Sequence, residues 1–111
     1  MFERSRTGAV NVLCGNVPLN VQNTKDLDAL FSECLAAGQP RVVLDLEGVP
    51  LIDSAGLELL LAFQERCVER GGTIKLAGPT PLCRDILTVT EMISRFEVLP
   101  DRLAAVGSFS Q

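Results

Sequence analysis

Residues 41–46 have the sequence RVVLDL, which permits few types of fold. This run is rich in β-branched residues and is almost continuously apolar, whereas a strand with one face in water alternates apolar and polar residues. The run therefore predicts a strand that is covered on both faces, in the centre of a sheet. Strands of this kind belong to parallel sheets covered by helices, so the run favours an α/β fold.

Strand and helix patterns alternate along the rest of the chain. We expect strands at residues 2–6, 9–14, 41–46, 73–77 and 96–99, and helices at about 24–35, 54–70, 81–90 and 101–106. Asn23 or Thr24, Thr80 and Asp101 are placed to cap three of these helices. An initial hairpin followed by βαβ units predicts an α/β fold with a mixed β-sheet of four to five strands packed with about four helices. A length of 111 residues fits one such domain, spanning 1–111.

The spacing of apolar residues predicts which face of each helix is buried. The expected core residues of the helix at 24–35 are Leu27, Leu30, Phe31, Cys34 and Leu35. Those of the helix at 54–70 are Leu57, Leu60, Leu61, Cys67 and Val68. Those of the helix at 81–90 are Leu82, Ile86 and Leu87. A second apolar set on the helix at 54–70, Leu59, Ala62 and Phe63, indicates either burial on two sides or a partner-binding face.

Composition excludes several classes of function. The net charge of −4 disfavours binding to nucleic acid or to anionic lipid. The chain has no histidine, so the usual general base and the commonest metal ligand are missing. Its four cysteines form no C-x-x-C pair, and we expect buried thiols that are unpaired and bind no metal: Cys14, Cys34, Cys67 and Cys83. Without an apolar leader or a long apolar run, we expect a cytoplasmic protein with no direct membrane insertion.

The most informative motif joins the buried strand to the following helix. It reads Asp53-Ser54-Ala55-Gly56-Leu57, directly before the long helical pattern. With the preceding strand that ends in Asp-Leu, and with Gly71-Gly72 before the next strand, the chain resembles the STAS domain of bacterial anti-anti-sigma factors (anti-sigma factor antagonists). The resemblance covers nearly the whole chain, and it implies a single STAS domain over residues 1–111.

The resemblance also implies a function and partners. In that family the serine after the aspartate, here Ser54, is phosphorylated by a GHKL-type serine kinase that doubles as an anti-sigma factor. A PPM-type serine phosphatase reverses the modification. The unphosphorylated form binds the kinase and the phosphorylated form releases it. By resemblance, the partner-binding residues are Asp53, Ser54, Ala55, Gly56 and Leu57, and the chain needs no cofactor and is not an enzyme.

The residues themselves leave alternatives open. Ser54 at a helix start can be a phosphorylation site or a plain cap, and Asp53 can be a cap or a partner contact. Gly56 stands where alanine favours a helix by about 1 kcal/mol, so it indicates either close approach of another backbone or tight helix-to-sheet packing. Leu57 is more typical of a core residue than of a contact.

The chain departs from the family pattern at three places. Ala55 replaces a common second hydroxyl, Glu58 replaces a common glycine, and residues 16–20 lack a common acidic residue. The alternative function is a STAS accessory subunit of an ABC-type lipid transporter, which would bind the ATPase subunit. An enzyme is the weakest alternative, because the chain has no phosphate-binding glycine loop.

Overall fold

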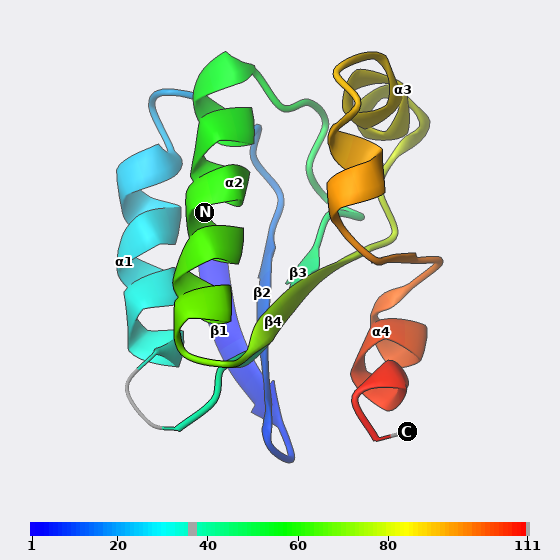
Figure 1. Ribbon diagram of the computed structural model, residues 1–111. Helices are drawn as coiled ribbons and strands as arrows, with labels where there is room; N and C mark the ends of the chain where they lie inside the picture. The colour runs from blue at the N-terminus through cyan, green and yellow to red at the C-terminus, as the bar shows by residue number, and fades with distance from the viewer. Residues whose placement is uncertain (36–37, 111) are drawn as a thin grey trace.

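The computed structural model describes residues 1–35 and 38–110, and within them the chain forms one five-stranded sheet. The strands lie in sequence order: β1 (Phe2–Thr7), β2 (Val10–Gly15), β3 (Arg41–Asp45), β4 (Thr73–Ala77) and β5 (Val98–Leu99) (Figure 1). β1 is antiparallel to β2, and the other neighbours are parallel. The expected α/β fold with a mixed sheet is therefore confirmed, and β3 is its central strand.

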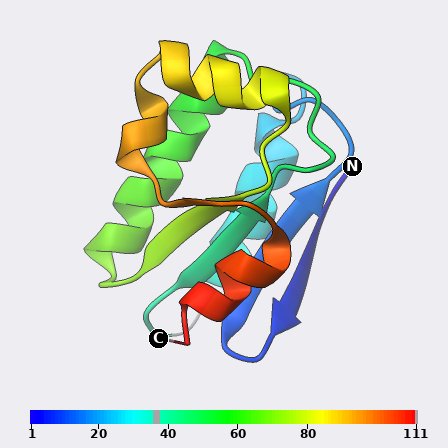
Figure 2. The ribbon, with the colours of Figure 1, turned by 90° about the vertical axis from the view of Figure 1, so that its right-hand side faces the viewer.

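Helices cover both faces of the sheet. α1 (Thr24–Cys34), α2 (Ser54–Glu69) and α3 (Pro81–Val89) connect successive parallel strands, and α4 (Arg102–Ser108) follows β5. Figure 2 shows α4 in front of the sheet and α1 and α2 behind it. A short 3-10 helix, η1 (Met92–Arg95), was not expected from the sequence. Within the described ranges, no helix is long and apolar enough to cross a membrane.

The alternation of side chains along β3 explains its two apolar faces. Val42 and Leu44 belong to the large core under α1, α2 and α3, whereas Val43 belongs to a smaller core that includes Ala105 of α4. All three β3 side chains are completely buried. The nearly unbroken apolar run of residues 41–46 is thus explained by helices on both sides of one strand.

Two expected core residues are exposed. Val68 on α2 is 64% exposed and Leu82 on α3 is 52% exposed, so the prediction was wrong for both. On α2 the buried stripe is Gly56, Leu60, Phe63 and Cys67, while Leu57 and Leu61 are half-buried against the core. A broad apolar pattern indicates that a helix is buried, but several rotations about its axis fit such a pattern equally well.

Phe63 settles the interpretation of the second apolar set. Its ring stacks on that of Phe31 in α1, with 3.9 Å between the centroids and 11° between the planes. Both side chains are completely buried. Leu59 and Ala62 beside it are half-buried. Phe63 thus belongs to the contact between α1 and α2, which favours burial on two sides over a partner-binding face.

All four cysteines are free thiols. Cys34, Cys67 and Cys83 are buried as expected, whereas Cys14 at the end of β2 is only half-buried, against expectation. Burial raises the pKa of Cys34 and of Cys67 to about 11 each. These thiols are therefore protonated at neutral pH and act as small apolar side chains.

Truncating the stacked ring tests this core. We expect Phe63→Ala to lower the free energy of unfolding by about 3–5 kcal/mol, because it leaves a cavity beside Phe31. The matched control on the same helix is Val68→Ala, which should change it by less than about 0.5 kcal/mol because Val68 is exposed. Urea unfolding followed by circular dichroism measures both. Equal destabilisation by the two substitutions would contradict the observed rotation of α2.

Candidate functional site

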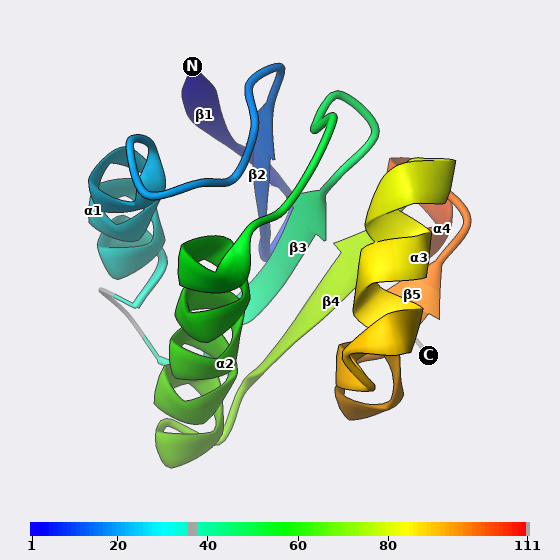
Figure 3. The same ribbon diagram turned by 90° about the horizontal axis from the view of Figure 1, so that it is seen from above.

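The site lies where the chain leaves the central strand and enters α2. The strand-like segment before α1 pairs with the segment before α2 through one parallel bridge, Leu19 to Ile52. Leu19 N–H donates to Leu51 O at 2.9 Å, and Asp53 N–H donates to Leu19 O at 3.1 Å. Figure 3 shows the chain leading into α1 passing beside the start of α2. These two backbone hydrogen bonds hold the start of α2 against a segment more than thirty residues away in the sequence.

Asp53 caps α2. Its Oδ1 accepts a hydrogen bond from Gly56 N–H at 3.0 Å, and its Oδ2 accepts one from Val21 N–H at 3.4 Å. The backbone of Asp53 is extended, as expected for a residue directly before a helix. Of the two residues that could cap the helix, Asp53 does so, and the interpretation of Ser54 as a plain cap is wrong.

Gly56 allows another backbone to approach the first turn of α2. A Cβ atom on Gly56 would lie 2.5 Å from Leu19 O and 2.9 Å from a side-chain carbon of Ile52. Real contacts are not this short, so any larger residue would push the two segments apart. The glycine therefore serves a close backbone approach within the chain itself.

Ser54 is the first residue of α2 and is exposed. None of the hydrogen bonds among the described residues involves its hydroxyl group. Ala55 is half-buried, and Leu57 is half-buried against the core, as its sequence context favoured. The five motif residues are therefore adjacent but differ in role, since Ser54 faces water while Asp53, Gly56 and Leu57 hold the helix start in place.

The sequence analysis missed two exposed apolar residues near the start of α2. Val21 is 71% exposed, and its N–H group binds the Asp53 carboxylate; Leu51 is 37% exposed and lies three residues before Ser54. Neither belongs to a periodic pattern, and Val21 comes next to Asp53 only through the Leu19–Ile52 bridge. We call Val21, Leu51 and Ser54 the Ser54 surface. It combines exposed apolar side chains with a free hydroxyl group, which suits a surface that docks on a protein.

The electrostatics of the helix start are mixed. The first turn of α2 contains no acidic residue, and a helix N-terminus carries a positive partial charge that favours an anion. Asp53 precedes Ser54, and Glu58, which is exposed, follows it one turn later. A phosphate on Ser54 would thus meet an attractive helix end and two nearby carboxylates.

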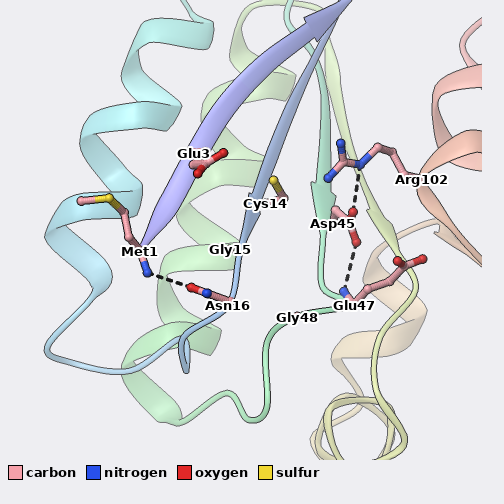
Figure 4. A pocket seen from close by; sticks show the side chains of 9 residues that line it. All are labelled: Met1, Glu3, Cys14, Gly15, Asn16, Asp45, Glu47, Gly48 and Arg102. Carbon is pink, nitrogen blue, oxygen red and sulfur yellow. Dashed lines mark hydrogen bonds and ion pairs between the residues drawn. The ribbon is translucent and has the colours of Figure 1, made fainter.

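A second polar site lies where β2 and β3 end, on the side of α4. A cavity of about 430 Å³ is lined by residues that include Glu3, Cys14, Asp45, Glu47 and Arg102 (Figure 4). Asp45 is buried, its Oδ2 accepts a hydrogen bond from Arg102 Nε at 2.9 Å, and its Oδ1 accepts one from Glu47 N–H at 3.0 Å. The hydrogen bond to Asp45 raises the pKa of Arg102. These contacts fasten α4 to the end of β3.

Asp45 and Asp53 do not form a common acidic centre. Asp45 binds Arg102 on the α4 side of the sheet, whereas Asp53 binds backbone N–H groups at the start of α2. Over residues 1–35 and 38–110, no group of three or more cysteine, aspartate and glutamate side chains is arranged to hold a metal ion.

The sequence matches the family described as "Mlab, STAS domain" over residues 9–99. Among curated proteins, the chain is similar to BtrV from Bordetella bronchiseptica, which is named as an anti-sigma factor antagonist. The two are 30% identical over 98 residues, which cover 88% of this chain and 84% of BtrV.

Solved structures share the fold along almost the whole chain. A protein from Thermotoga maritima, described as an anti-sigma factor antagonist, superposes with a TM-score of 0.91 and 22% identity, and the match covers 99% of this chain and 95% of that protein. The unphosphorylated form of the anti-sigma factor antagonist SpoIIAA gives a TM-score of 0.82 and 17% identity, with 99% and 96% covered. The phosphorylated form of SpoIIAA, from Bacillus, gives a TM-score of 0.75 and 16% identity. The match covers 98% of this chain and 99% of that protein.

A transporter protein also shares the fold. The structure of a sulfate transporter family protein from Wolinella succinogenes gives a TM-score of 0.78 and 21% identity, covering 94% of this chain and 86% of its own. The fold is thus common to regulators and to transport proteins. Together with the family match over most of its length, the described architecture leads to one conclusion: the chain belongs to the STAS domain family.

Proposed function

We propose that this STAS protein is an anti-sigma factor antagonist that works as a phosphorylation-controlled partner switch. Its unphosphorylated form binds a GHKL-type serine kinase that is also an anti-sigma factor, and phosphorylation of Ser54 releases that partner. The observation that carries the proposal is the exposed, unbonded hydroxyl group of Ser54 on a helix start that Asp53 caps. Ser54 can therefore be modified without loss of the cap.

The relatives support this proposal. BtrV is named as an anti-sigma factor antagonist, and SpoIIAA has been solved in unphosphorylated and phosphorylated forms on the same fold. The position of the free hydroxyl group, directly after the capping aspartate, agrees with the motif by which the chain resembles this family.

Physical chemistry explains how one phosphate could release a partner without unfolding the domain. A phosphoserine adds a charge of about −1.5 to −2 at neutral pH, and the start of α2 stabilises an anion. In a complex, the same charge would be pressed between the partner and the apolar side chains of Val21 and Leu51. Burial without a counter-charge then weakens binding. A hundredfold loss requires only about 2.7 kcal/mol.

The proposal assigns different roles to the motif residues. Ser54 and the flanking apolar side chains contact the kinase, Asp53 and Gly56 position the helix start, and Ala55 and Leu57 lie at its edge. The chain itself supplies no catalytic residue and needs no cofactor, because the kinase provides ATP and the base that takes the hydroxyl proton. A PPM-type serine phosphatase restores the binding form, and the cycle takes place in the cytoplasm.

A STAS accessory subunit of an ABC-type lipid transporter is the second candidate. It is favoured by the fold likeness to a transporter family protein, although that protein is described as a sulfate transporter. In this role the domain binds an ATPase subunit, and a phosphate on Ser54 has no regulatory effect. The two candidates therefore differ in the affinity of the phosphorylated form.

Phosphorylation should control binding. We expect wild-type protein phosphorylated at Ser54 to bind its genomically linked serine kinase at least about a hundredfold more weakly than the unphosphorylated form, by isothermal titration calorimetry. Ser54→Ala should keep its affinity after incubation with kinase and ATP, and Ser54→Asp should lose only part of it, because a carboxylate carries less charge than a phosphate. Equal affinity of the phosphorylated and unphosphorylated wild type would reject the switch.

The apolar part of the Ser54 surface should contribute to binding. We expect Leu51→Ser and Val21→Ser each to weaken kinase binding by about tenfold, because each removes apolar area from the contact. Val89→Ser is the matched control, since Val89 is an exposed apolar residue on α3, 83% exposed. All three variants should keep the wild-type melting temperature. An effect of Val89→Ser as large as that of Leu51→Ser would argue against this location of the interface.

The assignment of the cap can be tested by stability. Asp53→Ala should lower the free energy of unfolding by about 0.5–2 kcal/mol, because it leaves N–H groups of Gly56 and Val21 without their acceptor. Ser54→Ala should change it by less than about 0.5 kcal/mol, since the hydroxyl group has no partner. Denaturant titration of the two variants gives both numbers. If Ser54→Ala lowered the free energy of unfolding more than Asp53→Ala did, Ser54 and not Asp53 would be the capping residue.

A further inference from the structure

A cluster of arginines lies at the opposite end of the sheet from Ser54. Ser54 follows the end of β3, whereas this cluster lies where β2 and β3 begin. A small, rather enclosed cavity of about 100 Å³ there is lined by Arg4 and Arg6 of β1, Asn11 of β2 and Arg41 at the start of β3. The proposed partner switch makes no use of these residues.

Arg4, Arg6 and Asn11 are brought together by the register of the hairpin. Arg6 is paired directly with Asn11 in the antiparallel ladder. Arg4 and Arg6 are two residues apart on a strand, so their side chains leave the same face. Arg4 Nη1 donates a hydrogen bond to Asn11 Oδ1 at 3.0 Å. The hairpin therefore places two guanidinium groups and one amide on a single side of the sheet.

The donors of this cluster are only partly used. Asn11 is 8% exposed, and its amide oxygen is occupied by Arg4. Among the described residues, no hydrogen bond is made by the amide nitrogen of Asn11, and no hydrogen bond or ion pair is made by the guanidinium group of Arg6. No buried side-chain nitrogen or oxygen among the described residues lacks a partner, so the Asn11 amide nitrogen is reached by solvent, as is the guanidinium group of the exposed Arg6. Both groups are free to donate to an acceptor in the cavity, which either water or an anion can supply.

The charge balance of the cavity favours an anion. Three arginines line it, and the one carboxylate among the lining residues belongs to Glu33, which is 3.8 Å from Arg4. Cys34 also lines it, and burial raises the pKa of that thiol to about 11, so it carries no negative charge at neutral pH. This positive site lies in a chain whose net charge is −4.

We infer that this cavity binds an oxyanion of the size of phosphate, held by the Arg6 guanidinium group and the Asn11 amide, with Arg4 and Arg41 adding positive charge. Guanidinium groups bind phosphate oxygens through paired, charge-assisted hydrogen bonds. Cavities that enclose drug-sized ligands measure about 300–1,000 Å³, so this one suits a single phosphate group. That group is either free phosphate or the end of a phosphate monoester.

Nuclear magnetic resonance can locate the binding. Inorganic phosphate is titrated into the ¹⁵N-labelled, unphosphorylated full chain, with sulfate-free buffer and constant ionic strength. We expect saturable shifts of the amide signals of Arg6, Asn11 and Arg41. A parallel titration with glycerol 3-phosphate identifies the source: equal binding indicates a monoester site, and binding of inorganic phosphate alone indicates a site for the free anion.

Two substitutions with opposite expected effects on phosphate binding make the test specific. Arg6→Gln should weaken phosphate binding by about tenfold, because it removes the free guanidinium group. Glu33→Gln should tighten binding severalfold, because it removes the opposing carboxylate. Arg84→Gln is the matched control, since Arg84 is an exposed arginine on α3, away from the cavity.

The inference would be overturned by shifts centred on Ser54 and the start of α2, by no saturable shift at all, or by equal binding of wild type and Arg6→Gln. Absence of binding at the cavity leaves the proposed kinase binding untouched, because the cavity and the Ser54 surface share no residue.

Discussion

The carboxylate of Asp53 joins two segments that lie far apart in the sequence, and the geometry of the site depends on this connection. One oxygen caps α2 through Gly56 and the other binds the backbone of Val21. The Leu19–Ile52 bridge brings these partners into reach, and the missing Cβ of Gly56 lets the segments touch. The Asp53 carboxylate, backbone hydrogen bonds and the buried Gly56 fix the helix start. The Ser54 hydroxyl group therefore makes no contact that the fold requires.

The domain therefore presents Ser54, which can be modified, on a helix that other residues hold in place. Behind the helix start, the stacked rings of Phe31 and Phe63 hold α2 on α1, and the Asp45–Arg102 pair holds α4 on the other face of the sheet. None of these contacts includes Ser54. A charge added at Ser54 therefore acts on whatever docks there, while the contacts that hold the helices on the sheet stay in place. The arginine-lined cavity at the far end of the sheet is structurally independent of this arrangement.

Local sequence signals predicted the fold well. The unbroken apolar run at residues 41–46 indicated the central strand, and Thr80 and Asp101 cap their helices as expected. The predictions of burial and of site residues failed where these depend on packing between segments that are distant in the sequence. The exposure of Val68 and Leu82 follows from the rotation of each helix on the sheet, which periodicity alone does not determine. Val21 joins the site only through pairing of distant segments, for which the local sequence carries no signal. Leu51 is close in sequence, but it belongs to no periodic pattern that would mark it as exposed.

We propose that a phosphate on Ser54 changes a surface and leaves the fold unchanged. Hydrogen exchange of the phosphorylated and unphosphorylated protein, measured by nuclear magnetic resonance, distinguishes these two effects. We expect the same protection for the amides of β3, β4 and the second half of α2, with changes confined to residues 19–21 and 50–58. Loss of protection across β3 and β4 after phosphorylation would contradict it, because release of the partner would then follow from unfolding of the domain.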